Sequence, residues 1–289
     1  MRKVLAFVLV AIVAPCAVFG QGFTNIALVP VVARLGGIPP TFWKSDVVIH
    51  NPRDFSFKVA VAYFPFDRAN QLPSPGEFPV VLDLAAGETK LLEDVLGNYF
   101  GITGSSKGAL FFTSDPLNVP SNPEQAWFLV TTRTYNAADP KGTYGQTIAP
   151  NTMMFNGSAT SSYAVGARYG GRYRSNLGIV NASREQIRVH FRIRNAAGQD
   201  IKQGYKDLPA FSGGQWSFGD LGVPQSNDAP TVMLYMDPAS VTPNPCTADH
   251  VNYFLGYVSK VDGNPEGTGD AEFIWATPTE VPPAGFNCP

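Results

Sequence analysis

Trp43-Lys44-Ser45-Asp46-Val47-Val48-Ile49-His50-Asn51 decides the fold, because the chain returns to this stretch 130 positions later. The second version reads Tyr173-Arg174-Ser175-Asn176-Leu177-Gly178-Ile179-Val180-Asn181. Shorter matches follow in the same order: Asp83-Leu84 recurs as Asp207-Leu208, and Phe128-Leu129 as Phe254-Leu255. A repeat in constant order indicates two copies of one unit of roughly 120 residues, in tandem.

Within each copy, apolar and polar residues alternate, which is typical of a strand with one buried face. After the turn residues 51–54, the alternation resumes through Phe57 and Val59. We therefore predict a hairpin in which Ile49 lies opposite Phe57. The same register in the second copy has Ile179 opposite Ile187. It also predicts two like-charged pairs, Arg174 opposite Arg192 and Arg172 opposite Arg194.

Period-2 alternation recurs along the whole chain, whereas helical periodicity is almost absent. One short helix is expected, near residues 92–99. Further strands are expected near 24–33, 78–83, 88–93, 107–114, 126–135, 144–149, 160–167, 203–208, 215–219, 230–236, 251–261 and 271–276. So many short strands per unit predict an all-β fold of two tandem antiparallel β-sandwich domains, immunoglobulin-like in kind.

The first twenty residues have the features of an export signal: Arg2 and Lys3, then an apolar run, then Val18-Phe19-Gly20 before Gln21. The expected organisation is a signal peptide over 1–20, a first domain over 21–150, a linker over 151–162 and a second domain over 163–289 with a tethered C-terminal tail. The expected location is secreted, either extracellular or periplasmic. The sequence predicts no transmembrane segment.

Cleavage would remove Cys16 and leave Cys246 and Cys288, and an even pair in an exported protein predicts a disulfide. Charged residues make up only 15% of the chain. Without Arg2 and Lys3 there are 19 basic and 23 acidic residues, so the overall charge points to no particular partner and makes nucleic acid a poor candidate.

Three sets of residues carry a resemblance to known proteins. They are Val29-Pro30-Val31-Val32-Ala33-Arg34, Phe42-Trp43-Lys44-Ser45-Asp46 with Asn51-Pro52, and Arg133-Thr134-Tyr135-Asn136 with Gly142-Thr143-Tyr144-Gly145. On these residues the chain resembles uncharacterised exported bacterial proteins built from tandem immunoglobulin-like β-sandwich domains. The resemblance implies a fold and an exported location, and it implies no active site.

Catalysis by a histidine-based set has little material, since there are three histidines and no Gly-X-Ser-X-Gly motif beside them. A glycosidase needs only two suitably spaced carboxylates, which scattered acids could supply. We therefore expect a protein that is not an enzyme and has no cofactor. A carbohydrate-active module or glycoside hydrolase-like enzyme on a β-sandwich is the alternative.

A calcium loop is a second candidate, over residues 262–270. Its oxygen ligands would be Asp262, Asn264, Glu266 and Asp270, but the glutamate expected at the twelfth position is absent. A plain hairpin turn is the favoured interpretation, so no metal is expected. The four tryptophans, Trp43, Trp127, Trp216 and Trp275, could form a sugar platform, although Trp43 and Trp127 are better placed for the core.

The most specific signal is a basic stripe in the second unit. Residues 166–206 contain nine basic side chains and only two acidic ones, Glu185 and Asp200. If Val189 and Phe191 point inward, alternate residues point outward. The predicted anion patch consists of Arg172, Arg174, Arg188, His190, Arg192 and Arg194. An arginine-covered, solvated sheet face without a ligand is the competing interpretation.

The expected function is therefore binding, adhesion or assembly outside the cell. The partner would be an anionic glycan, a lipid headgroup or an acidic protein surface. Because the first unit has Lys44 and Ala62 where the second has Arg174 and Arg192, the repeated fold does not itself require the stripe.

Overall fold

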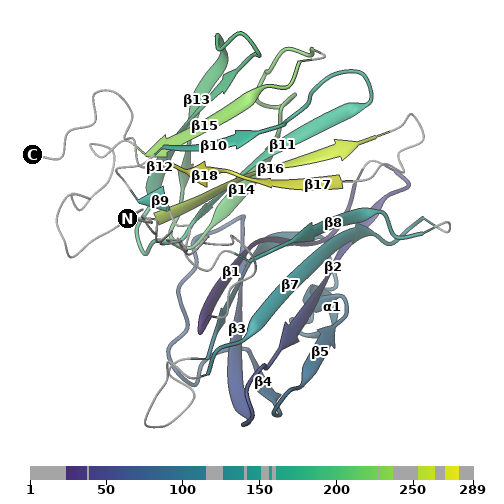
Figure 1. Ribbon diagram of the computed structural model, residues 1–289, viewed down its shortest axis with the longest axis vertical. Coiled ribbons are helices and arrows are strands. Elements are labelled where there is room, and N and C mark those ends of the chain that lie inside the picture. Colours follow the sequence, from purple (N-terminus) through teal and green to yellow (C-terminus); the bar gives the residue numbers. More distant parts are fainter. Residues whose placement is uncertain are drawn as a thin grey trace, which may run out of the picture.

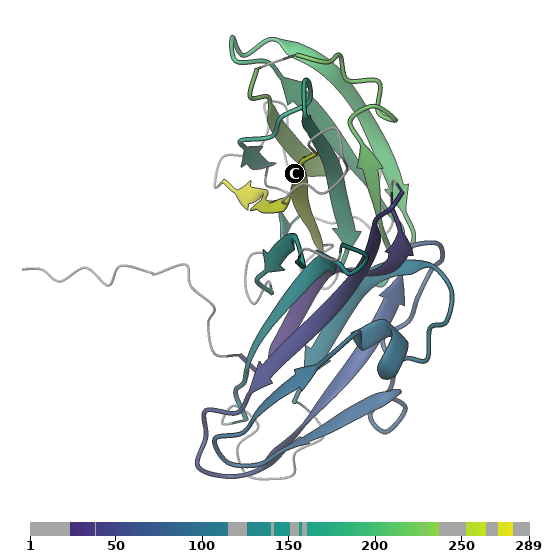
Figure 2. The ribbon, with the colours of Figure 1, turned by 90° about the vertical axis from the view of Figure 1, so that its right-hand side faces the viewer.

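The computed structural model describes residues 24–37, 39–114, 126–139, 142–150, 156–157, 161–226, 228–236, 253–263 and 271–279. The protein is all-β, with three open antiparallel sheets, and its described part contains one short helix, α1 (Val95–Asn98). The two halves of the chain lie one above the other along the long axis of the molecule (Figure 1; Figure 2).

The first half forms an eight-stranded sheet in the order β4-β3-β6-β1-β2-β7-β8, with β5 paired to β2. Its strands are β1 (Ile26–Gly36), β2 (Phe42–His50), β3 (Phe57–Pro65), β4 (Val80–Leu84), β5 (Thr89–Leu92), β6 (Ser106–Thr113), β7 (Leu129–Asn136) and β8 (Gly145–Ile148). The long strand β1 connects the strands β4-β3-β6 to the strands β2-β7-β8 of this sheet. It pairs with β6 over most of its length and with β2 at Leu35 and Gly36.

The second half contains two five-stranded sheets, β13-β12-β15-β10-β18 and β14-β11-β16-β17, with β9 paired to β16. Their strands are β9 (Asn156–Gly157), β10 (Ser161–Val165), β11 (Tyr173–Asn181), β12 (Ile187–Arg194), β13 (Asp200–Leu208), β14 (Gly213–Ser217), β15 (Thr231–Met236), β16 (Tyr253–Asp262), β17 (Ala271–Trp275) and β18 (Thr277–Pro278). The expected strands and the helix are confirmed to within a few residues. β10 begins inside the range predicted as a linker.

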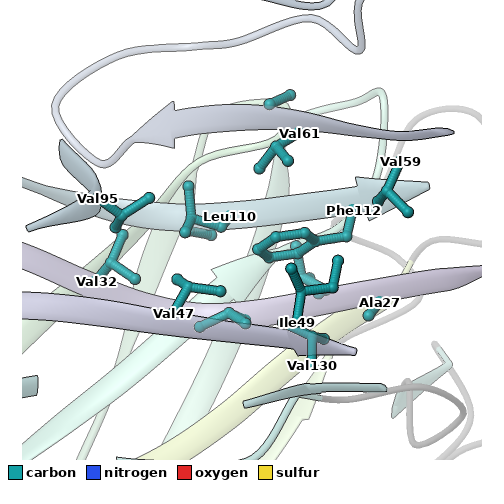
Figure 3. Close-up of a cluster of buried hydrophobic side chains, with 14 of the residues drawn as sticks. Ala27, Val32, Val47, Ile49, Val59, Val61, Val95, Leu110, Phe112 and Val130 are labelled. Atoms are coloured by element: carbon teal, nitrogen blue, oxygen red, sulfur yellow. The ribbon is translucent and has the colours of Figure 1, made fainter. Parts of the chain in front are cut away.

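The alternating apolar residues fill a core between the strands, as predicted from their parity. In the first half, Val47 and Ile49 of β2 meet Val59 and Val61 of β3 around the fully buried Phe112 (Figure 3). A second core lies between the two five-stranded sheets and contains residues of both. Burial of these side chains is the main stabilising term, at roughly 25 cal/mol per Å² of apolar surface.

The predicted hairpins are wrong. β2 pairs with β1, β5 and β7, whereas β3 pairs with β4 and β6. Likewise β11 and β12 belong to different sheets, so Ile49 and Phe57, or Ile179 and Ile187, are not cross-strand partners. Alternation identifies the buried face of a strand but not its neighbour. In the second half this connection passes over the core from one sheet to the other, and in the first half it joins two strands of one sheet that are not neighbours.

A buried asparagine holds each crossing in place. The Asn51 amide donates to the carbonyls of Phe55, Leu84 and Ala85 at 2.8, 3.3 and 2.8 Å, and its oxygen accepts from the Arg53 backbone. The side chain is fully buried, so these bonds satisfy carbonyls that water does not reach.

The second half repeats this arrangement at Asn181. Its amide donates to the carbonyls of Glu185, Leu208 and Pro209 at 2.7, 3.1 and 2.8 Å. Its oxygen accepts from the backbone of Ser183 at 2.8 Å, and the residue is 1% exposed. The sequence pattern predicts both asparagines only as turn residues, whereas the structure shows them buried.

The junction between the halves is largely apolar. Tyr257 is fully buried and belongs to the same hydrophobic cluster as the first-half core, together with Val180 and Leu255. Polar contacts add to it, since the Asn70 side chain donates to the Phe211 carbonyl at 2.8 Å. Strands β8 and β17 also lie side by side here (Figure 1).

Candidate functional site: an arginine and tyrosine face on β12

The outward residues of β12 form the centre of the candidate site. Ile187, Val189, Phe191 and Ile193 are buried, while the residues between them are partly exposed. The predicted alternation of β12 is therefore confirmed. It places Arg188, His190, Arg192 and Arg194 on the outer face of the β13-β12-β15-β10-β18 sheet, in the upper part of Figure 1.

Two aspartates of β13 pair with these arginines. Arg188 donates two hydrogen bonds to Asp207, at 2.7 and 2.9 Å, and Arg194 donates one to Asp200 at 2.7 Å. The Arg188 hydrogen bond lowers the pKa of the Asp207 carboxyl, and the Asp200 hydrogen bond raises the pKa of Arg194. Side chains exposed to this degree gain little stability from such pairs, but the pairs fix the orientation of the guanidinium groups.

Arg192 is the least neutralised arginine of the row. Its closest carboxylate among the described residues is that of Asp200 at 3.8 Å, and Arg194 already contacts this carboxylate at 2.7 Å. Three guanidinium groups thus face two carboxylates across β12 and β13. The excess positive charge lies at Arg192, near the middle of the row.

Two tyrosines that were not among the predicted site residues, Tyr205 and Tyr235, flank the row. The Arg188 guanidinium lies 4.0 Å from the ring centroid of Tyr205, and that of Arg192 lies 5.6 Å from Tyr235. The His190 ring stacks on Tyr235 with centroids 5.1 Å apart and planes 12° apart. Tyr205 is 50% exposed. We call this surface the β12 face and define it as Arg188, His190, Arg192, Arg194, Tyr205 and Tyr235.

Arg174 lies elsewhere, on β11 of the other sheet, and Arg172 directly precedes that strand, so the pairs Arg174–Arg192 and Arg172–Arg194 do not exist. Arg172 instead contacts Asp262 at 2.8 Å. Its hydrogen bond to Tyr173 and the nearby Asp262 raise its pKa. Arg174 points to the junction of the halves, where it lines a cavity. The six predicted residues therefore form two separate groups.

The corresponding face of the first half has a different character. Lys58 pairs with Asp83 across β3 and β4, as Arg188 does with Asp207 across β12 and β13. At the following positions of the same parity along β3 stand Ala60, Ala62 and Phe64, which are all buried. A charged cross-strand pair thus occurs in both halves, whereas the remaining cations and the tyrosines occur in the second half alone.

The other predicted sites are placed as follows. Asp262 is engaged by Arg172, while Asn264, Glu266 and Asp270 lie outside the described residues. No group of three or more His, Cys, Asp or Glu side chains suited to a metal occurs in the part of the chain that the structure describes. Residues 1–20, Cys246 and Cys288 also lie outside it.

The tryptophans do not share one surface. Trp127 is 42% exposed, so its predicted place in the core is wrong. Trp216 lies under the Lys206 ammonium at 4.7 Å, and Trp275 packs edge-on against Phe273. Trp43 lines the junction cavity.

A cleft beside β6 offers no paired carboxylates among its described lining residues. It has a volume of about 930 Å³ and is lined by Leu72, Phe78, Phe111 and Phe211, with Arg184 as the charged residue among its described lining. A glycosidase would need two acids facing each other in such a place.

No protein-family model matches the chain, and a search of the curated proteins finds no match. Within the described ranges, no helix has both the length and the apolar character needed to cross a bilayer.

Proposed function

We propose that the protein is an exported, non-enzymatic binding protein made of two tandem immunoglobulin-like β-sandwich units. The order β4-β3-β6-β1 in the first half matches β13-β12-β15-β10 in the second, and β5-β2-β7-β8 matches β14-β11-β16-β17. The equivalent bonds of Asn51 and Asn181 support the same duplication.

We further propose that the β12 face binds a linear acidic glycan. Outward residues on a strand repeat about every 6.6 Å, so Arg188, Arg192 and Arg194 form a row along β12 rather than a pocket. A row of cations suits a chain that carries negative charge at regular intervals. Tyr205 and Tyr235 add aromatic surface beside the row, on which the apolar faces of sugar rings can stack.

The observation that carries this proposal is the excess cation at Arg192, which lies beside the Tyr235 ring on an exposed face. A glycan is favoured over a lipid headgroup because the face lies along a strand and none of its six residues lines the cavities described above. An acidic protein surface would be drawn by charge alone, without needing the tyrosines.

Binding should require both charge and rings. We expect a galacturonic acid oligomer to bind the intact protein, and Arg192→Gln or Tyr235→Leu to weaken binding about tenfold each, which corresponds to roughly 1.4 kcal/mol. Affinity should fall steeply with salt, because exposed charges are screened over about 8 Å at physiological ionic strength. Isothermal titration at two salt concentrations measures this.

Matched controls separate the alternatives. The methyl-esterified oligomer has the same sugar rings without charge and should bind weakly. Lys58→Gln alters the corresponding position of the first half and should leave affinity unchanged. Equal affinity for polyglutamate, or an unchanged affinity in Tyr235→Leu, would contradict the glycan assignment.

A further inference from the structure

A second candidate site lies at the junction of the two halves. A cavity of about 140 Å³ is enclosed by residues of both halves. Its polar lining consists of side chains that can donate hydrogen bonds: Thr134, Gln146, Arg174, Asn176, Gln215 and Ser259. No aspartate or glutamate is among its described lining residues.

Among the described lining residues, Arg174 is the only charged group. It is partly buried, and no carboxylate of the described residues forms an ion pair with it. Burial lowers the pKa of the Arg174 guanidinium, and no charge of the described residues opposes that effect. A partly desolvated cation without a counter-ion is costly, and a bound anion would offset the cost.

Gln146 supplies a second donor. It is 7% exposed, and its Oε1 accepts a hydrogen bond from the Ser259 hydroxyl at 3.1 Å. The amide oxygen is therefore engaged across the junction, and the NH₂ group remains as a donor beside the cavity.

The first half shows what a neutralised version of this position looks like. Lys44 of β2 occupies the place that Arg174 has on β11, since Lys44 lies opposite Tyr135 of β7 and Arg174 opposite Val261 of β16. The Lys44 ammonium contacts the buried Asp94 at 3.0 Å. Asp46 supports Asp94 by accepting its backbone N–H at 2.8 Å.

The second half keeps the cation and lacks both acids. Asn176 stands on β11 where Asp46 stands on β2. Asp220, the sequence match of Asp94, is exposed, and its backbone N–H bonds to the Ser217 hydroxyl. Among the described residues, an amide and a guanidinium without a carboxylate partner thus replace the internal ion pair of the first half. This difference favours the binding of an external anion.

We propose that this junction cavity binds a small oxyanion, a carboxylate or phosphate group, through the Arg174 guanidinium with Gln146 as a second donor. The planar guanidinium fork matches two oxygens of such a group. Because Gln146 belongs to the first half and Arg174 to the second, the bound anion would bridge the halves and stabilise their junction. This site is independent of the β12 face.

Thermal unfolding of the full chain tests the proposal, with inorganic phosphate and acetate as probes and chloride used to keep ionic strength constant. A ligand that binds only the folded state raises Tm in a saturable way. We expect a rise of about 4 °C or more at saturation with one of the probes, and a one-to-one stoichiometry by isothermal titration. Arg174→Gln should abolish both effects.

Three variants make the outcome decisive. Arg172→Gln removes the neighbouring exposed arginine and Arg192→Gln removes the centre of the β12 face, and both should retain the rise. Arg174→Lys keeps the charge but loses the fork, so it should bind at least tenfold more weakly. Absence of a saturable rise in the unmodified protein, or an equal rise in Arg174→Gln, would overturn the assignment.

Discussion

Asn181→Ala is expected to lower the free energy of unfolding by about 3 kcal/mol, because it removes the donor for the carbonyls of Glu185, Leu208 and Pro209 together. Leaving buried acceptors unpaired costs roughly 1–3 kcal/mol each, and partial rearrangement reduces the total. Asn181→Asp should be at least as destabilising, since a carboxylate cannot donate and would face carbonyl oxygens. Urea denaturation followed by tryptophan fluorescence measures both.

Asn195→Ala is the matched control. Asn195 lies in the exposed turn between β12 and β13, where its oxygen accepts from the backbones of Ala197 and Gln199 at 3.1 and 2.9 Å. Water can replace these bonds, so the loss should stay below about 1 kcal/mol. Equal losses for Asn181→Ala and Asn195→Ala would show that the buried asparagine does not hold the crossing. Asn51→Ala should behave like Asn181→Ala.

Tyr257 gives the second large effect, through packing at the junction. Its ring is fully buried, stacks on Phe273 with centroids 4.8 Å apart and lies against Gly178, where an added Cβ would come within 1.9 Å of the ring. Tyr257→Ala should cost about 4 kcal/mol, the range for removing a large core aromatic. Tyr144, which is 37% exposed, supplies a control, and Tyr144→Ala should cost less than about 0.5 kcal/mol.

Tyr257→Phe should raise the free energy of unfolding rather than lower it. The Tyr257 hydroxyl is buried and has no hydrogen-bond partner among the described residues, so deleting it removes an unsatisfied polar atom. We expect a gain of up to about 1 kcal/mol. Burial also raises the pKa of Tyr257. The contribution of this residue to the free energy of unfolding is therefore complete below the ordinary tyrosine pKa of about 10, and it is lost as the pH rises further. The phenylalanine variant should lose less stability than the unmodified protein above pH 10.

The sequence predicted the strands well because their parity reflects burial, which is a local property. It failed on strand neighbours because β2 and β3 bury the same parity against one core from opposite sides. The recurrence of Asn51 as Asn181 was the available signal for a buried corner. An exposed turn would have no need for the same residue in both copies.

The candidate site was predicted only in part, because alternation within a strand can be read from the sequence and strand pairing cannot. The outward row on β12 followed from alternation, whereas its partners depended on pairing. With β13 and β15 as neighbours, Asp207 lies opposite Arg188, and His190 lies between Tyr205 and Tyr235. The predicted hairpin of β11 and β12 instead has Arg174 as the cross-strand neighbour of Arg192. The junction cavity is formed by residues of both halves, and no local sequence pattern predicts which residues of the two halves come into contact.

The central claim is that the β12 face of the second half, and not its first-half counterpart, binds an acidic glycan. Hydrogen–deuterium exchange of the full chain with and without a galacturonic acid oligomer tests it directly, with β3 and β4 as the internal reference. We predict slower exchange in peptides covering β12, β13 and β15, and unchanged exchange in β3 and β4. Equal protection of the two regions, or protection confined to residues outside β12, β13 and β15, would contradict the account.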